Sequence, residues 1–307
     1  MPSILQNPGD TNIYLNVDDV WYRYDSTAPP LGEGAMGIVW LGFRCDDGER
    51  VAVKQIRPEL CVIPMIRARA KLEAMLVVDH PHVVRMIGYC EGSPSEGPLY
   101  ILSEYVSGMT MEEHVRSQLS RLPVDERDRK IALEFLPIVE GVGALHAQGI
   151  IHRDIKPSNI MLQDGFRPKL MDLGIAKADR FFDAHLCGTA GTRPFAAPEQ
   201  IVPDDVEAQV DARSDIYSLG VTLSYLAGGE FPLDASLHPA RLIDIIARAT
   251  AKDPEDRFAD TEQLKEALME YVSDSADGTE EVKSDRTPWT VLLLIVVLAV
   301  ALTFIFI

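Results

Sequence analysis

Two short polar motifs constrain the fold and the chemistry of this 307-residue chain more than any other feature. Residues 152–159 read His-Arg-Asp-Ile-Lys-Pro-Ser-Asn between apolar runs, and an Asp-Leu-Gly motif begins at Asp172. The first motif presents a carboxylate (Asp154), an ammonium group (Lys156) and an amide (Asn159) at fixed spacing. Phosphoryl transfer needs such groups: an acceptor for the hydroxyl proton, a cation for the γ-phosphate and oxygen ligands for Mg²⁺. The two motifs therefore predict phosphoryl-transfer chemistry rather than an accidental polar loop.

Three further motifs occur in the order that this chemistry requires. Residues 32–37 read Gly-Glu-Gly-Ala-Met-Gly and precede an apolar run, which indicates a strand, a turn and a second strand. The pattern is weak alone, but its glycines would let backbone N–H groups approach phosphates closely. Downstream, Lys54 ends the apolar strand Val-Ala-Val-Lys, from which it can reach the α- and β-phosphates. Ala-Pro-Glu at residues 197–199 is typical of a segment that docks a substrate.

At these motifs the chain resembles the protein kinase family, and specifically its bacterial-type (eukaryotic-like), membrane-anchored serine/threonine members. The resemblance covers nearly all of the chain before its last, apolar segment. It implies an α+β fold of two lobes, a small β-rich N-lobe over a larger helical C-lobe, with ATP in the cleft. We place the kinase domain at residues 21–272, with the N-lobe at 21–105 and the C-lobe at 106–272.

The resemblance also implies roles for individual residues. Asp154 is expected to be the catalytic base, Lys156 to contact the γ-phosphate, and Lys54 to pair with a glutamate on the first long helix. Asn159 and Asp172 would bind Mg²⁺, or Mn²⁺ in its place. The expected catalytic residues are Asp154, Lys156, Asn159, Lys54, Glu73 and Thr192. The expected ATP-binding residues are Leu31, Gly32, Glu33, Gly34, Ala35, Met36, Gly37, Val39, Ala52, Lys54, Ser103, Glu104, Val106 and Met161.

Within this set, the family pattern places Val39 and Ala52 above the adenine and Met161 below it, with residues 104–106 as the hinge between lobes. Ser103 occupies the position that borders the space behind the adenine. A serine there leaves more room than the larger residues common in the family.

The family pattern also predicts two contacts that support the active site. Glu199 is expected to pair with Arg257, and Asp215 is expected to brace the catalytic loop from a buried helix.

The partner of Lys54 is ambiguous in the sequence. Glu73 lies at the usual distance from the lysine, whereas counting back from Pro81 places Lys71 at the glutamate position. We favour Glu73, because a two-residue deletion in the linker after the helix would cost little stability, whereas a second lysine would repel Lys54.

Serine/threonine specificity rests on Lys156 and Thr192, which match the serine/threonine pattern of the family. Protein substrates are therefore expected. Because Arg153 can order a phosphate near the active site, we expect autophosphorylation at Thr189, with a transient homodimer allowing one copy to modify another.

Two alternatives are a pseudokinase scaffold, which would be expected to lose Lys54, Asp154 or Asp172, and a small-molecule phosphotransferase, which would not need the segment around residues 197–199.

Composition limits the partners further. The chain has 29 basic and 47 acidic residues, a formal charge of −18, which argues against binding nucleic acid or anionic lipid through bulk charge. Its four cysteines form no C-x-x-C pair and no zinc-binding spacing with the seven histidines.

The two ends of the chain are expected to lie outside the kinase domain. Residues 1–20 suggest a short polar extension, and residues 273–287 an acidic, solvated linker. Residues 289–307 carry no charge, and about 19 residues at roughly 1.5 Å each give about 28 Å, enough to span a bilayer. We therefore expect a transmembrane helix at residues 288–307. Lys283 and Arg286 on its kinase side favour a single-pass protein of the cell membrane with a cytoplasmic kinase domain.

Overall fold

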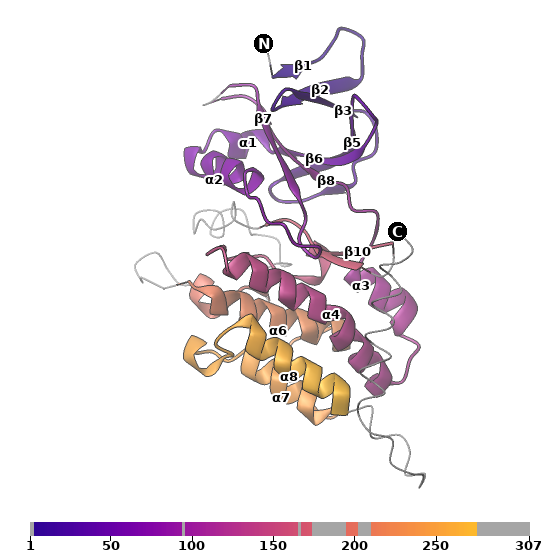
Figure 1. Ribbon diagram of the computed structural model, residues 1–307, viewed down its shortest axis with the longest axis vertical. Coiled ribbons are helices and arrows are strands. Elements are labelled where there is room, and N and C mark those ends of the chain that lie inside the picture. The colour runs from indigo at the N-terminus through magenta and orange to yellow at the C-terminus, as the bar shows by residue number, and fades with distance from the viewer. Residues whose placement is uncertain (1–2, 94–95, 165–166, 174–194, 202–209, 275–307) are drawn as a thin grey trace, which may run out of the picture. The chain divides into compact units, whose positions relative to one another are not determined.

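The computed structural model describes residues 3–93, 96–164, 167–173, 195–201 and 210–274. The described residues up to 272 belong to one compact unit, in which an N-terminal β-sheet stands over a group of α-helices (Figure 1). The predicted α+β fold of two lobes is therefore confirmed.

The N-lobe is built on an antiparallel sheet in the order β1-β2-β3-β5-β6-β8-β7, with β4 paired to β5. Its core is formed by alternate side chains of these strands, such as Leu15, Val53 and Leu102, none of which is exposed. The strands are β1 (Ile4–Leu5), β2 (Asn12–Val17), β3 (Val20–Asp25), β4 (Gly32–Glu33), β5 (Gly37–Arg44), β6 (Arg50–Ile56), β7 (Met86–Glu91) and β8 (Leu99–Glu104).

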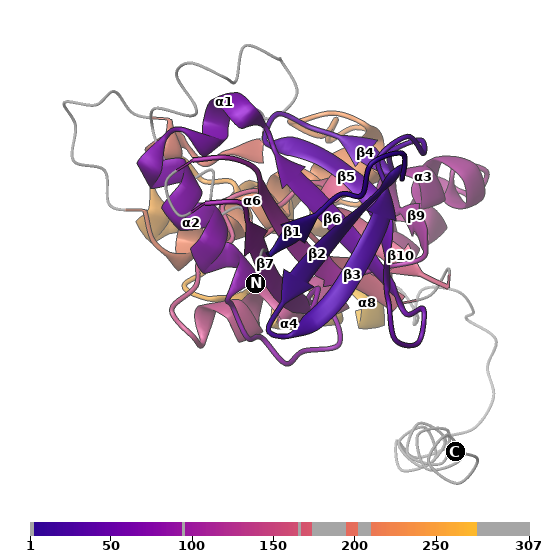
Figure 2. The same ribbon diagram turned by 90° about the horizontal axis from the view of Figure 1, so that it is seen from above.

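The first strands of the sheet correct the expectation of a polar extension over residues 1–20. β1 and β2 extend the sheet beyond β3 (Figure 2), and the turn between β2 and β3 uses Asp18 and Asp19 at φ values of 48° and 66°. Leu15 and Val17 of β2 are buried, because alternate residues of this strand face the N-lobe core. Asn16, the one polar residue between them, is half-buried on the other face of the strand.

One long helix of the N-lobe carries Glu73. Helix α2 (Pro64–Ala74) follows the short helix α1 (Pro58–Cys61) and packs beside β7 and β8. Its position is fixed by Glu91 of β7, whose two carboxylate oxygens lie 2.9 Å from Arg67 Nη2 and 2.9 Å from Lys71 Nζ. Arg67 is 3% exposed, so this shared carboxylate neutralises a buried cation.

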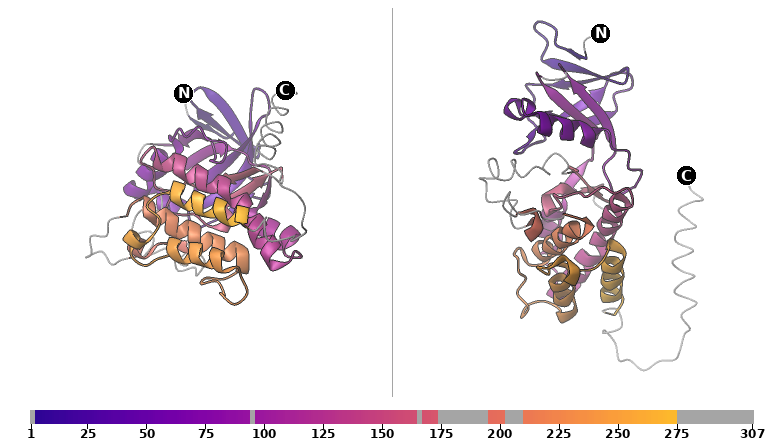
Figure 3. Two further views of the ribbon diagram at one scale, coloured as in Figure 1. Left: turned by 60° about the horizontal axis from the view of Figure 1, so that its bottom comes forward. Right: turned by 90° about the vertical axis from the view of Figure 1, so that its left-hand side faces the viewer.

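The C-lobe consists mainly of helices, with a small sheet β11-β10-β9 beneath the N-lobe. Helix α4 packs on α6, and α6 on α7, so that these helices lie side by side (Figure 3). The elements are β9 (Gly108–Thr110), α3 (Met111–His114), the π-helix η1 (Val115–Leu119), α4 (Val124–His146), the 3₁₀ turn η2 (Pro157–Asn159), β10 (Ile160–Gln163), β11 (Arg167–Leu170), the 3₁₀ turn η5 (Pro198–Gln200), α6 (Ala212–Gly228), α7 (Ala240–Ala249), the 3₁₀ turn η6 (Pro254–Asp256) and α8 (Thr261–Asp274).

The apolar stripe of α4 forms the centre of the C-lobe core. Ile131, Phe135, Ile138 and Val142 recur at helical spacing and are fully buried. Burying each such side chain stabilises the fold by about 1.5–3 kcal/mol. This rigid base holds the loop that follows α4, which carries the catalytic motif.

No helix in the described part of the chain is long and apolar enough to cross a membrane. The expected transmembrane helix at residues 288–307 lies outside the described residues, as does the expected linker beyond Asp274.

Candidate active site

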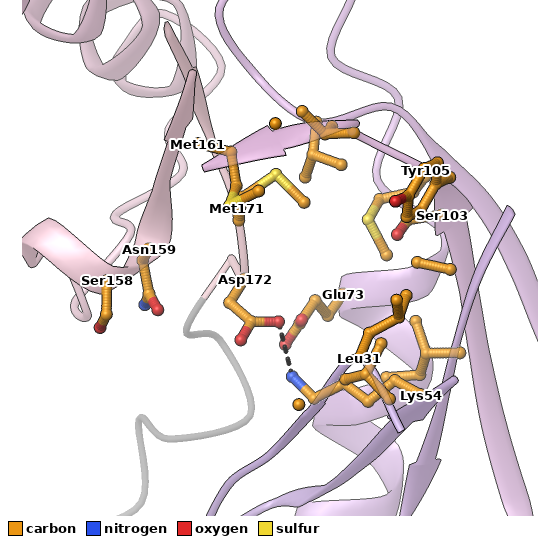
Figure 4. A pocket seen from close by; sticks show the side chains of 18 residues that line it. Leu31, Lys54, Glu73, Ser103, Tyr105, Ser158, Asn159, Met161, Met171 and Asp172 are labelled. Carbon is orange, nitrogen blue, oxygen red and sulfur yellow. Dashed lines mark hydrogen bonds and ion pairs between the residues drawn. The ribbon is translucent and has the colours of Figure 1, made fainter. Parts of the chain in front are cut away.

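A cavity of about 320 Å³ lies where the two lobes meet, within the size range of small-molecule sites (Figure 4). Side chains from both lobes and from the segment between them line it. They are Leu31, Gly32, Val39, Ala52, Lys54, Glu73, Val84, Met86, Ile101, Ser103, Tyr105, Val106, Gly108, Ser158, Asn159, Met161, Met171 and Asp172.

The charged end of the cavity contains Lys54, Glu73 and Asp172. Lys54 Nζ lies 2.8 Å from Asp172 Oδ1, which joins strand β6 of the N-lobe to the Asp-Leu-Gly motif (Figure 4). Burial by itself would lower the pKa of Lys54, but the charges of Asp172 and Glu73 outweigh it, so the pKa is raised and the ammonium form is favoured. The cavity therefore holds a fixed cation suited to a phosphate.

The structure places Glu73, rather than Lys71, on the side of α2 that faces Lys54. Glu73 is 4% exposed and lines the cavity, and its charge contributes to the raised pKa of Lys54. Lys71 instead pairs with Glu91 and stacks 5.0 Å above the ring of Tyr89. Lys54 also forms an ion pair with Asp172.

The catalytic loop holds Asp154 between two donors. Asn159 Nδ2 donates to Asp154 Oδ2 at 2.7 Å and to its backbone oxygen at 2.9 Å, and Lys156 Nζ lies 3.2 Å from Oδ2. Asp154 is 4% exposed. These contacts fix the direction of a carboxylate that could accept a proton from a hydroxyl group.

Asp215 of helix α6 braces this loop, as predicted. Its two carboxylate oxygens accept hydrogen bonds of 2.8 Å from the backbone N–H groups of His152 and Arg153, and His146 Nε2 lies 2.8 Å from Oδ2. Arg153 has a φ of 66°, in the left-handed region that costs free energy for residues other than glycine. The fully buried Asp215 therefore stabilises a strained backbone directly before Asp154.

Asn159 and Asp172 are suitable ligands for Mg²⁺. The amide nitrogen of Asn159 is directed at Asp154, so its side-chain oxygen is directed elsewhere, and Asp172 adds a carboxylate on the same cavity. The described residues contain no cluster of three or more His, Cys, Asp or Glu that could hold a metal alone. Mg²⁺ usually takes one or two protein carboxylates together with phosphates and water.

The glycine-rich loop has two kinds of glycine. A Cβ on Gly37 would lie 2.1 Å from the backbone oxygen of Gln55, so strand pairing requires glycine there. A Cβ on Gly32 or Gly34 would meet nothing within 4 Å. Because the described fold does not require glycine at these two positions, their open space suits the close approach of a phosphate.

Five loop residues predicted to contact ATP do not line the cavity. Met36 is 4% exposed and packs into the N-lobe core beside α1 and α2, because it is the apolar residue at the loop tip. Glu33 Oε1 lies 2.8 Å from Arg57 Nη2. The other three are Gly34, Ala35 and Gly37.

Around the hinge, Ser103 and Val106 line the cavity, whereas Glu104 does not. The carboxylate of Glu104 lies 2.5 Å from Lys169 Nζ and accepts from the backbone N–H of Arg85 at 2.8 Å, so it connects the lobes instead. Tyr105 lines the cavity in its place.

The apolar walls agree with the predicted arrangement of Val39 and Ala52 on one side and Met161 on the other, all three on the same cavity. Sequence reasoning did not assign seven lining residues to the site. Four of them are apolar residues that look like ordinary core in the sequence, namely Val84, Met86, Ile101 and Met171. The others are Gly108, Ser158 and Tyr105, which lies within the predicted hinge.

Two further predictions concern the segment after Asp172. Glu199 and Arg257 pair as expected, with Arg257 Nη1 and Nη2 at 2.7 and 2.8 Å from Oε1 and Oε2 of Glu199. Thr189 and Thr192 lie outside the described residues.

Comparisons with known proteins agree with this geometry. The family model described as "Protein kinase domain" matches residues 26–277. The chain is 32% identical to the serine/threonine-protein kinase Pkn1 of Myxococcus xanthus, in a match that covers 81% of this chain and 39% of Pkn1. It is 30% identical to the serine/threonine-protein kinase PknB of Mycobacterium leprae over 83% of this chain and 44% of PknB. The chain thus spans about two fifths of these relatives.

Among solved structures, the chain is similar to the PknI kinase domain of Mycobacterium tuberculosis. The two share 27% identity and a TM-score of 0.62, over 81% of this chain and 95% of that domain.

Proposed function

This chain belongs to the protein kinase family, and we propose that it is a serine/threonine protein kinase that transfers the γ-phosphate of ATP to protein hydroxyl groups. One observation carries the proposal: Lys54, Asn159 and Asp172 line a single cavity, and Asn159 holds Asp154 beside it. A pseudokinase would be expected to lose one of these groups. A small-molecule phosphotransferase would not need the substrate-docking segment that the Glu199–Arg257 pair supports.

The proposed chemistry assigns one task to each residue. Asp154 accepts the proton as the substrate oxygen bonds to the γ-phosphorus, while the bond to the β-phosphate bridging oxygen breaks and ADP leaves. Lys156 offsets the charge on the transferred group, and Lys54 holds the phosphates that remain with ADP. Asn159 and Asp172 would bind Mg²⁺, which neutralises phosphate charge when bound.

We also propose that the kinase is activated by phosphorylation of Thr189 by another copy of the chain. Support comes from Arg69 of α2, whose Nη1 is buried with no hydrogen-bond partner among the described residues. The pKa of Arg153 is lowered by burial and by the positive charge of Arg69, so the two guanidinium groups interact unfavourably with each other. A phosphate near both would relieve that repulsion and pair with them.

The membrane assignment is a separate proposal that rests on the uncharged sequence of residues 288–307 and the basic residues before it. We propose a single-pass protein of the cell membrane with its kinase domain in the cytoplasm. Deleting residues 288–307 should move the protein from the membrane fraction to the soluble fraction of cells. Unchanged membrane association of the deletion variant would contradict the proposed anchor.

The proposed activity is tested by incubating the purified protein with γ-labelled ATP, Mg²⁺ and a generic protein substrate, followed by phosphoamino-acid analysis. Label on serine and threonine is expected. Label on tyrosine alone, or none on protein, would contradict the proposal. Mass spectrometry of the same reaction should find phosphate on Thr189, and an unmodified Thr189 in fully active enzyme would contradict the activation step.

A further inference from the structure

A second, larger cavity lies on the C-lobe beside the catalytic loop, with a volume of about 860 Å³. We call it the acceptor groove. Ser158 lines both this groove and the nucleotide cavity, and Lys156 also lines the groove. The groove therefore adjoins the point where the proposed phosphoryl transfer would occur.

Apolar residues and arginines form the walls of the acceptor groove. Val115 and Leu237 lie on opposite elements, η1 and the segment before α7, and supply apolar surface. Arg116 of η1 is exposed, and Arg127 of α4 is half-buried. Glu112 is the only carboxylate among the described residues that line the groove.

Arg127 is held in a fixed position. Its Nε donates to Asp128 Oδ1 at 3.2 Å, and its Nη2 lies 3.2 Å from the same oxygen. Asp128 is fully buried and also binds His238 Nδ1 through Oδ2 at 2.5 Å. An arginine has five N–H donors, so these contacts leave Arg127 with donors for a second carboxylate.

Arg116 differs from Arg127 because no ion pair of its side chain occurs among the described residues. Lys156 and Arg127 each face a carboxylate of the protein, Asp154 and Asp128. Arg116 lies within electrostatic range of Glu113, an exposed carboxylate that does not line the groove. Opposing Arg116 from the same wall is Glu112. Among the described side chains that line the groove, Arg116, Arg127 and Lys156 thus outnumber the single carboxylate, in a chain whose formal charge is −18.

We propose that Arg116 and Arg127 select protein substrates that carry a carboxylate side chain close to the phosphorylated hydroxyl. This inference rests on the proposed kinase function. Guanidinium groups bind carboxylates with two parallel hydrogen bonds, which gives both affinity and geometric selectivity. Two neutral residues of the groove, Ser158 and Tyr225, offer no attraction to a basic peptide.

The test uses the purified full chain, ATP, Mg²⁺ and peptides with one serine, in which each flanking position carries aspartate, alanine or lysine. We expect kcat/KM to be about 3- to 10-fold higher with aspartate than with alanine at one or more positions, the size of a partly exposed charge pair. Raising the salt from about 50 to about 500 mM should reduce this ratio, because exposed charges are screened.

Variants assign the preference to the two arginines. Arg116→Ala and Arg127→Ala should each bring the ratio of kcat/KM with aspartate to that with alanine towards one. Arg116→Glu should favour lysine peptides, and it should not impair folding because the site is exposed. Arg121→Ala is the matched control, because Arg121 is exposed near the same loop but does not line the groove. It should keep the wild-type ratio.

The outcomes separate this inference from the proposed function. Equal phosphorylation of all peptides by the wild type, or an aspartate preference that survives Arg116→Glu, would contradict the role of the arginines while leaving the kinase function intact. No phosphorylation of any peptide would contradict both.

Discussion

The buried ion pair between Glu199 and Arg257 gives a prediction whose size follows from the structure. The side chain of Arg257 is 0% exposed and makes two short bonds to Glu199. Glu199→Gln would keep the shape but leave the arginine without its carboxylate. Breaking a buried pair of this kind costs about 3–5 kcal/mol of unfolding free energy, or about 6–10 °C in Tm for a domain of this size.

The effect should depend on pH in a defined direction. Burial raises the pKa of Glu199, but hydrogen bonds from Arg257 and Ser214 outweigh it and hold the pKa below the ordinary value of 4.5. A carboxyl group with a lowered folded-state pKa stabilises the protein above its unfolded pKa, and this contribution is lost as the pH falls through the folded value. The difference between wild type and Glu199→Gln should therefore shrink below about pH 4.5.

Urea or thermal unfolding of both proteins between pH 7 and pH 3 measures this difference. Glu255→Gln is the matched control: Glu255 pairs with Arg213 at 2.8 Å, but its side chain is 79% exposed. That variant should lose less than about 1 kcal/mol at any pH. A loss of similar size in the two variants, or a Glu199→Gln effect that does not change with pH, would refute the reasoning.

Three other variants test separate contacts. In Asp215→Asn, the amide side chain can accept a hydrogen bond at full strength from only one of the two backbone N–H groups. We therefore expect about 1–3 kcal/mol of destabilisation and a lower kcat, with ATP affinity retained. An unchanged kcat would contradict the bracing role. Glu91→Gln should destabilise the fold by about 2–4 kcal/mol, because Arg67 is buried, whereas Lys71→Ala should cost less; equal unfolding midpoints for the two variants would count against this. Ser103→Met should weaken the binding of ATP-competitive inhibitors that carry a bulky group behind the adenine, while ATP affinity stays nearly the same. Equal inhibitor affinities of wild type and variant would mean that Met86, which pairs with Ser103 across the strands, already fills that space.

The sequence was sufficient where the chemistry dictates residue type and spacing. Asp154, Asn159, Lys54 and Asp172 could be predicted, because phosphoryl transfer needs charged and polar groups that are rare in apolar surroundings. The Asp215 brace followed from the same family pattern.

The sequence was insufficient where tertiary packing decides which way a side chain points. Met36 and Glu104 belong to the right segments, but one packs into the N-lobe core and the other binds Lys169 across the lobes. Strand β2 was missed, because burial of Leu15 depends on a sheet that forms from distant strands.

The most direct test of the account is to compare wild type with Asp154→Asn in a single-turnover transfer of the ATP γ-phosphate to a serine peptide, with ATP affinity measured in parallel. Loss of the proton acceptor should slow transfer by about 10²–10⁴-fold, since that is the usual contribution of general base catalysis. ATP affinity should remain near that of the wild type, because Asp154 does not line the nucleotide cavity. Transfer by Asp154→Asn at the wild-type rate would contradict the assignment of the active site.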